Sequence, residues 1–178
     1  MTIRVIRPSK HTDKRGYFSE IYNRKRYTEI GIPDEFVQDN HSLSNAIYTI
    51  RGLHLQKPPS AQGKLVRCGR GKIFDVAVDI RVGSPTYGKW EGYMLTPENG
   101  LQIYVPIGFA HGFVSLEPYS EIVYKCTNYY DPEAEAIIRW DSCGIDWPLT
   151  NEPILNDKDI NAPKLQDFES PFIFGVNS

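Results

Sequence analysis

Three side chains that could together hold an anion and move a proton lie close to one another in the sequence: Arg51, His54 and Lys64. An imidazole titrates near neutral pH and can accept or donate a proton, while guanidinium and ammonium groups attract anions. The alternative is a partly solvated strand end with ordinary surface cations. In a regular strand Arg51 and His54 would point to opposite faces, because the side-chain period is two. A shared site therefore requires a bulge near Gly52, or an Arg51 side chain that reaches around a rim.

A further histidine, His111, ends a Pro-x-Gly-x-x-His motif that begins at Pro106. This motif resembles the second motif of the cupin superfamily, in which a turn delivers a histidine into a small barrel. The alternative is a hydrogen-bonded core histidine. Metal-binding cupins carry His-x-His in their first motif, whereas here His54 is followed by Leu55 and Gln56. Because a catalytic transition-metal site usually needs three or more protein ligands, we expect a metal-free cupin whose polar interior serves proton transfer or binding.

Tyr124 lies in a segment with strand-like alternation, which places Ile122, Tyr124 and Cys126 on one face. An inward-facing tyrosine is usually a packed aromatic with one satisfied hydroxyl, but it can also donate a proton beside a base. Near the C-terminus, Lys158 and Asp159 belong to a short charge run that by itself indicates a solvated surface.

Many short strands are expected around these residues, because 13 prolines, 14 glycines and 11 tyrosines are spread along the chain. The clearest strand covers residues 72–80, where Phe74, Val76, Val78 and Ile80 form one face and Asp75 and Asp79 alternate onto the other. A turn at residues 69–71 predicts a hairpin between residues 64–68 and 72–80. Further strands are expected at residues 4–7, 36–38, 46–51, 101–105, 113–116, 121–127 and 136–139.

Helical periodicity is scarce. Residues 22–30 predict one short helix that Gly31 and Pro33 stop, and irregular coil with a turn of helix is expected from Trp147 onward. Strands at this spacing with so little helix favour a sandwich or a barrel.

Length and charge favour a single soluble domain over residues 1–178. A formal net charge of −2, from 20 basic and 22 acidic side chains, gives no general attraction to nucleic acid or to an anionic membrane. The three cysteines are odd in number and widely spaced, so we expect reduced, mostly buried thiols in a cytoplasmic protein. No stretch has the pattern of a signal peptide or the 18 apolar residues of a membrane span.

Eight segments, in order and at compatible spacing, resemble the dTDP-4-dehydrorhamnose 3,5-epimerase family, from about residue 3 to about residue 168. They are residues 13–20 (DKRGYFSE), 36–42 (FVQDNHS), 51–54 (RGLH), 62–66 (QGKLV), 75–81 (DVAVDIR), 108–113 (GFAHGF), 124–125 (YK) and 158–159 (KD). The resemblance implies an all-β, cupin-type jelly-roll barrel with a few short peripheral helices. It also implies a homodimer whose N-terminal strands cross to the partner subunit.

The implied reaction is a carbohydrate isomerisation in dTDP-rhamnose biosynthesis. The family's substrate is dTDP-4-dehydro-6-deoxy-D-glucose, a nucleotide sugar whose C3 and C5 hydrogens both lie α to a ketone. Each epimerisation removes one of these protons, passes through an enolate and returns a proton on the opposite face, which gives dTDP-4-dehydro-L-rhamnose. No cofactor is required, in agreement with the lack of a Gly-rich dinucleotide fingerprint in this sequence.

Four residues match the family's catalytic positions. His54 matches the base, and Asp159 matches the carboxylate that orients this histidine and stabilises its protonated form. Lys64 matches the cation beside the ketone oxygen, where negative charge develops in the enolate. Tyr124 matches the acid on the opposite face of the sugar.

Further residues match family positions that bind the substrate. Arg15 and Arg51 match residues near the diphosphate, which suits the forked guanidinium group. Positions that match contacts with the sugar or the nucleotide are Glu20, Gln38, Asp39, Asn40, His111, Tyr130, Glu135 and Lys158. Asp75 resembles the family's supporting partner of His111, and some of these contacts are expected to come from the neighbouring subunit.

Three alternatives stay open at this point. A related enzyme that inverts only C3 or only C5 would keep the same acid and base. A metal-dependent cupin dioxygenase or isomerase would bind a metal through His54 and His111. A non-catalytic module that binds sugar nucleotides would be expected to have lost His54, Tyr124 or Asp159, and all three are present.

Overall fold

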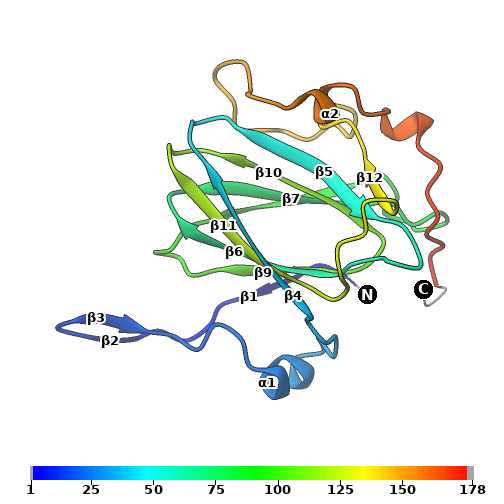
Figure 1. Cartoon of the computed structure of the whole chain (residues 1–178). Helices are drawn as coiled ribbons and strands as arrows, with labels where there is room; N and C mark the ends of the chain where they lie inside the picture. Colours follow the sequence, from blue (N-terminus) through cyan, green and yellow to red (C-terminus); the bar gives the residue numbers. More distant parts are fainter. Residues whose placement is uncertain (1, 176–178) are drawn as a thin grey trace.

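Two five-stranded antiparallel sheets face each other in a computed structural model that describes residues 2–175 (Figure 1). The first sheet has the order β1-β9-β6-β11-β4, with bounds Arg4–Ile6, Gln102–Val105, Lys64–Arg70, Ser120–Cys126 and Gln38–Ser44. The second sheet has the order β12-β5-β10-β7-β8, with bounds Glu135–Ile137, Ile50–Gln56, Phe109–Ser115, Ile73–Asp79 and Trp90–Leu95. A separate hairpin pairs β2 (His11–Asp13) with β3 (Gly16–Phe18). The expected all-β jelly-roll class is confirmed.

The helices of the described residues are short and peripheral, as expected. They are α1 (Arg24–Glu29), α2 (Asp157–Ile160) and the 3-10 turn η1 (Leu165–Asp167). The N-terminal helix is two residues shorter at its start and one residue shorter at its end than predicted, because Asn23 caps it by accepting a hydrogen bond from the Arg26 amide. None of the helices within residues 2–175 is long and apolar enough to cross a membrane.

The predicted hairpin between residues 64–68 and 72–80 is wrong. β6 pairs with β9 and β11 in the first sheet, whereas β7 pairs with β8 and β10 in the second. The link at residues 71–72 therefore crosses from one sheet to the other, and Gly69 and Arg70, which were expected in a turn, belong to β6. A glycine turn between two alternating strands fits a hairpin and a sheet-to-sheet crossing equally well, so the local pattern could not distinguish them.

The predicted strands match the observed ones with shifted ends, and three strands were missed. β2, β3 and β8 were not predicted because they lack a strong alternation of apolar and polar residues. All residues of β2 and β3 are exposed. β4, β5 and β10 extend well beyond the predicted residues into polar or glycine-containing stretches. Tertiary pairing decided their ends rather than residue propensity.

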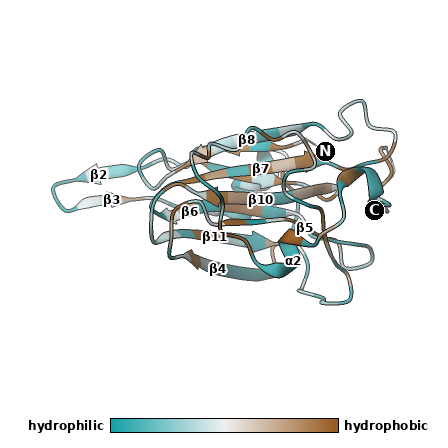
Figure 2. Cartoon of the chain, turned by 90° about the horizontal axis from the view of Figure 1, so that it is seen from above, coloured by the Kyte–Doolittle hydropathy of each residue, from teal (hydrophilic) through white to brown (hydrophobic). Residues whose placement is uncertain are grey.

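Three apolar clusters hold the two sheets and the segments outside them together. One lies between the sheets and includes Val66 and Ile122 from the first sheet with Ala77 and Phe113 from the second. A second cluster packs the C-terminal segment on the outer face of the second sheet, and a third packs α1 and its neighbours on the outer face of the first. Viewed from above, the β2–β3 hairpin extends away from these packed layers (Figure 2).

A bulge in β5 puts two chemically important residues on one face. Arg51 pairs with Phe113 and His54 pairs with His111, so three steps along β5 match two steps along β10. Gly52 has φ +119°, and a Cβ at this position would lie 2.7 Å from the Gly112 Cα and 2.7 Å from the His111 carbonyl oxygen. The bulge that a shared Arg51–His54 site requires is therefore present, and only glycine fits it.

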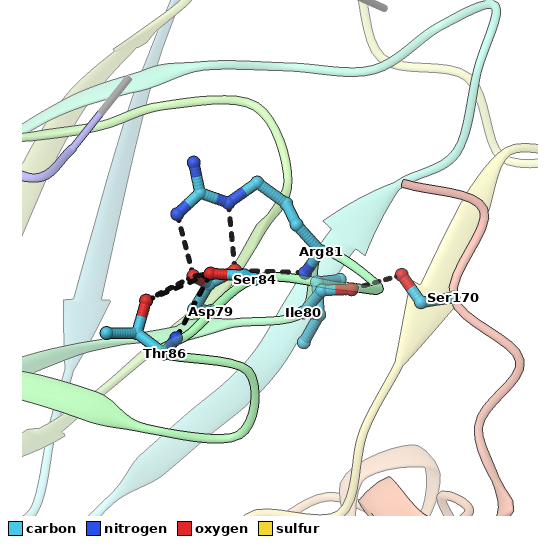
Figure 3. Close-up of polar contacts among 6 residues, drawn as sticks. All are labelled: Asp79, Ile80, Arg81, Ser84, Thr86 and Ser170. Carbon is cyan, nitrogen blue, oxygen red and sulfur yellow. Dashed lines mark hydrogen bonds and ion pairs between the residues drawn. The ribbon is translucent and has the colours of Figure 1, made fainter. Parts of the chain in front are cut away.

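The end of β7 has a hydrogen-bond network around Asp79, and the neighbouring Ile80 is tied to the C-terminal segment (Figure 3). The buried Asp79 carboxylate accepts hydrogen bonds from the Arg81 guanidinium (2.9 and 2.7 Å), from Ser84 Oγ (2.6 Å) and from Thr86 Oγ1 (2.6 Å). Next to it, Ser170 Oγ donates to the Ile80 carbonyl. Burial raises the pKa of Asp79, but the hydrogen bonds outweigh it and hold the pKa at about 2.

Replacing Gly52 by alanine is expected to destabilise the fold strongly. The new methyl group would collide with the β10 backbone, and the positive φ adds strain, so we expect a loss of about 3 kcal/mol. The matched control is Gly144→Ala, because Gly144 has φ +64° but no atom within 4 Å of the added Cβ; about 1 kcal/mol is expected there. Denaturant unfolding of the purified variants measures both values. Equal losses at the two positions would show that the close approach of β5 and β10 is unimportant.

Asp79 is expected to make the protein lose stability in acid. Its folded-state pKa lies below the ordinary value of 3.8, so its stabilisation is present above pH ~4 and is lost as the pH falls through ~2. The contribution is about 2 kcal/mol. The difference in unfolding free energy between the wild type and Asp79→Asn should therefore shrink between pH 4 and pH 2. A difference that stays constant over this range would contradict the assignment.

Candidate active site

The first sheet lines the space between the sheets with polar side chains. On β11, Tyr124 lies opposite Asn40 on β4, and Cys126 lies opposite both Lys64 on β6 and Gln38 on β4. Residues directly opposite each other share a face, and Tyr124 packs against the apolar cluster between the sheets, so all five side chains belong to the inner face. The predicted common face of Ile122, Tyr124 and Cys126 is confirmed.

The second sheet contributes a complementary set. His111 on β10 lies opposite His54 on β5 and Ala77 on β7, while Phe113 lies opposite Arg51 and Asp75. Because Ala77 and Phe113 belong to the cluster between the sheets, the register places these polar partners on the inner face as well. The residues predicted for proton chemistry are thus collected on the two facing walls of one interior.

His54 is held by a carboxylate that comes from the far end of the chain. A hydrogen bond of 2.8 Å joins Nε2 of His54 to Oδ1 of Asp159, whose side chain is fully buried, while the imidazole is about one third exposed at 33%. Asn156 caps α2 by accepting a 2.7 Å hydrogen bond from the Asp159 amide, and the other Asp159 oxygen lies 3.4 Å from the Gly52 nitrogen. A buried carboxylate fixed in this way orients the ring and stabilises the imidazolium form.

Burial adjusts the acidity of two groups on the opposite wall. The pKa of Lys64 is lowered by burial, which the nearby Cys126, Asp75 and Glu135 partly offset. The pKa of Tyr124 is raised by burial, against the opposing effect of the Arg51 guanidinium. Tyr124 therefore keeps its phenolic proton at neutral pH. Lys64 loses its proton more easily than a solvent-exposed lysine does.

Arg51 and His111 are both anchored by their surroundings. The Arg51 guanidinium donates to the Leu43 carbonyl at 3.0 Å and lies 3.5 Å from Ser44 Oγ. Nε2 of His111 lies 3.0 and 2.9 Å from the two carboxylate oxygens of Asp75, and both side chains are buried. The interior thus contains a second His–Asp pair, more deeply buried than the first.

Other predicted binding residues lie at the edge of the second sheet. Lys158 Nζ is 3.1 Å from Glu135 Oε2, and this carboxylate raises the pKa of the exposed Lys158. Glu135 lies opposite Gln56 in the edge strand β12. Tyr130 is exposed in the segment between β11 and β12.

Three predicted residues lie away from this interior in a single chain. Arg15 lies in the β2–β3 hairpin and forms an ion pair with Asp13 at 2.6 Å, with both side chains exposed. Glu20 pairs with Arg26 in the N-terminal segment. Asp39 is on the outer face of β4, where Lys125 Nζ donates to it at 2.8 Å.

Cys126 belongs to the inner polar face, although no role in the site was predicted for it. Its Sγ accepts a 3.4 Å hydrogen bond from Asn40 Nδ2, and the cysteine lies between Lys64 and Gln38. The signal was present in the alternation that it shares with Tyr124. As predicted, all three cysteines are buried free thiols.

Within residues 2–175, no three His, Cys, Asp or Glu side chains are grouped closely enough to hold a metal ion. His54 and His111 each bond instead to a different carboxylate. The side chains that converge here are a histidine–carboxylate pair, a partly buried lysine and a protonated tyrosine. Such a set can remove a proton next to a carbonyl group, stabilise the resulting oxyanion and return a proton.

Comparisons of the sequence and of the structure with known proteins point to the same family. The sequence model of the dTDP-4-dehydrorhamnose 3,5-epimerase family matches residues 2–167. The dTDP-4-dehydrorhamnose 3,5-epimerase of Salmonella typhimurium is 51% identical over 164 residues, which cover 90% of this chain and 89% of that protein.

Solved structures agree with the sequence match. The dTDP-6-deoxy-D-glucose-3,5-epimerase of Legionella pneumophila, in complex with dTDP-4-keto-L-rhamnose, is 46% identical and superposes with a TM-score of 0.90 over 94% of this chain and 89% of that one. A 3'-monoepimerase of Streptomyces bikiniensis, in complex with dTDP-quinovose, is 32% identical with a TM-score of 0.87 over 93% and 84% of the two chains. Both single-carbon and double epimerases thus share this fold.

Proposed function

Since the chain belongs to the dTDP-4-dehydrorhamnose 3,5-epimerase family, we propose that it is an isomerase that converts dTDP-4-dehydro-6-deoxy-D-glucose to dTDP-4-dehydro-L-rhamnose in dTDP-rhamnose biosynthesis. The observation that carries the proposal is the His54–Asp159 pair on one wall of an interior whose other wall presents Lys64 and Tyr124. Base, oxyanion partner and acid then lie around one enclosed space, as inversion at a carbon next to a ketone requires.

The first half of each inversion is proton removal. His54 removes a proton from C3 or C5. The C–H electron pair forms a double bond to C4, and the carbonyl π electrons move onto the C4 oxygen, which gives an enolate. Asp159 stabilises the imidazolium that results and keeps its ring in place. Lys64 lies where its ammonium group offsets the charge on the enolate oxygen, and its burial strengthens this interaction by excluding water.

The second half returns a proton on the other face. Tyr124 gives its phenolic proton to the same carbon while the enolate electrons re-form the C–H bond and the ketone. The tyrosine is regenerated by a proton from solvent, and His54 loses its proton to solvent. Because burial raises the pKa of Tyr124, the group remains protonated until a strong base such as an enolate lies beside it. All electrons stay within the substrate, so the proposal requires no cofactor and no metal.

Substrate binding is proposed for the polar residues that surround these four. Arg51 lies on the wall beside His54, and its fork suits a diphosphate oxygen. The remaining proposed contacts are Gln38, Asn40, His111, Tyr130, Glu135 and Lys158, with Asp75 supporting His111.

The test is NMR of the 4-keto-6-deoxyglucose nucleotide with the purified enzyme in deuterated water, followed by trapping with a reductase. Deuterium at both C3 and C5 with a trapped L-sugar is expected. Label at one carbon would move the assignment to a single-carbon epimerase, the second candidate, which the similarity to the S. bikiniensis monoepimerase favours. No label would mean a different substrate or a non-catalytic binding module.

Replacing His54 by asparagine is expected to reduce label uptake at both carbons by at least ~10³-fold, because the base is lost while its neighbours remain. The control is His41→Asn, since His41 is exposed and pairs with Glu121 on the outer face of the first sheet. Near-normal exchange in the His54 variant would remove this residue as the base.

We further propose that the protein is a homodimer in which the N-terminal hairpin crosses to the partner. The hairpin extends away from its own sheets and exposes Tyr17 (57%) and Phe18 (70%), an unusual state for two aromatic side chains in a monomer (Figure 1). Arg15, Glu20 and Asp39 would then bind the substrate of the neighbouring subunit or shape the interface rather than act in their own chain.

Mixed dimers test this arrangement directly. Each homodimer of His54→Asn or Arg15→Ala carries one defect in every site and is expected to be strongly impaired. If Arg15 acts across the interface, a refolded mixture restores one intact site per mixed dimer, up to about half of the wild-type rate in that species. If Arg15 acts within its own chain, the mixture shows only the mean activity of the two variants.

Residues 1–178 are proposed to form one domain in a cytoplasmic protein. The N- and C-terminal segments each pack on an outer face of the sandwich, so they should unfold together with it. The unfolding curves proposed for the Gly52 variants would show a single transition, and two transitions would contradict the one-domain assignment. Free buried cysteines suit a reducing compartment, which fractionation of the source cells would check.

A further inference from the structure

Three glutamine side chains hold the backbone of residues 128–131, just after β11 ends. Gln62 Nε2 donates to the Asn128 carbonyl at 2.8 Å, and Gln56 Nε2 donates to the Tyr129 carbonyl at 3.1 Å. Gln38 Oε1 accepts from the Tyr130 amide at 2.8 Å, and Gln56 Oε1 accepts from the Asp131 amide at 2.9 Å. Four consecutive residues are thus each fixed through one main-chain group.

The glutamines come from separate places and are fixed themselves. Gln38 is on β4 and Gln56 on β5, so the two belong to different sheets, while Gln62 lies in the loop before β6. Gln56 is 5% exposed and makes a further 2.6 Å hydrogen bond to the Ser60 carbonyl. Gln38 Nε2 donates to Asn40 Oδ1 at 3.1 Å. The segment is therefore anchored to both walls of the interior.

The consequence is a rigid backbone that carries two exposed aromatic rings. Tyr129 and Tyr130 are 66% and 54% exposed, although their main chain is hydrogen-bonded to glutamine side chains. A loop of this length ordinarily bonds to water and loses conformational freedom when it binds a ligand. Here that freedom is removed before binding, which strengthens binding by lowering the ordering cost.

We propose that Gln56 and Gln62 are positioning residues that, with Gln38, preform the Tyr129–Tyr130 segment for the nucleotide end of the substrate. The proposal rests on the proposed function, because it takes the ligand to be a nucleotide sugar. It also gives a role to two sequence features that the reaction leaves unexplained. Gln56 stands where metal-binding cupins carry their second histidine, and Gln62 begins the segment that leads to Lys64.

Gln62→Met and Gln56→Met test the proposal, since methionine keeps the side-chain length and removes one hydrogen bond at position 62 or three at position 56. We expect KM to rise about 3-fold for Gln62→Met and about 10-fold or more for Gln56→Met, with kcat within about 2-fold of the wild type. The dissociation constant of dTDP, measured by calorimetry, should rise by the same factors. Hydrogen exchange at the Asp131 amide should become faster in Gln56→Met.

Gln102→Met is the matched control, because Gln102 is equally buried but bonds to Tyr27 and Ile21, away from this segment. It should lower stability and leave KM and the dTDP dissociation constant unchanged. An unchanged dTDP dissociation constant in both test variants would overturn the proposal, as would an equal change in the control. If Gln56→Met fails to fold, the dTDP dissociation constant of Gln62→Met still tests the proposal, because Gln62 is only half-buried and its substitution should be tolerated.

The dTDP and hydrogen-exchange measurements separate this proposal from the proposed reaction. A wild-type protein that binds dTDP but does not label the sugar would refute the reaction, and the response of dTDP binding to the two variants would still support the positioning role. A wild-type protein that does not bind dTDP at all would overturn the positioning role.

Discussion

The close approach of two glycines, Gly52 on β5 and Gly112 on β10, is the constraint on which the site depends. Without a side chain at either position the two backbones can meet at a bulge, and the bulge brings Arg51 and His54 onto the same wall. The Gly52 amide also faces the Asp159 carboxylate. One backbone irregularity therefore orients His54, which is the proposed base, together with Arg51 and the Asp159 carboxylate.

A facing pair of sheets suits a reaction that needs opposite faces of one sugar. The second sheet provides His54 and Arg51, and the first provides Lys64 and Tyr124. Groups that must act from opposite sides are fixed on separate, stiff walls rather than on loops, which keeps their separation constant between proton removal and proton return.

Burial shifts the pKa values of Lys64 and Tyr124 in the interior, and it also requires that buried polar groups find hydrogen-bond partners. The buried carboxylates Asp75 and Asp159 each face a histidine, and the described residues contain no buried side-chain polar atom without a hydrogen-bond partner. Away from the site, the Asp79 carboxylate accepts hydrogen bonds from Arg81, Ser84 and Thr86, which stabilise the end of β7 (Figure 3). Hydrogen bonds to buried carboxylates thus stabilise both the site and the sandwich around it.

The fold class, the family and the inward face of Tyr124 could be predicted from the sequence, because alternation and motif spacing are local or ordered along the chain. The strand period also indicated that a shared Arg51–His54 site needs either a bulge near Gly52 or an Arg51 side chain that reaches around a rim, and the structure has the bulge. The pairing of the strands could be known only from the folded chain, since a glycine-rich segment such as residues 69–71 fits a hairpin and a crossing between sheets equally well. The contact between His54 and Asp159, 105 positions apart, and the glutamine bonds to residues 128–131 likewise arise from long-range packing that no local pattern encodes.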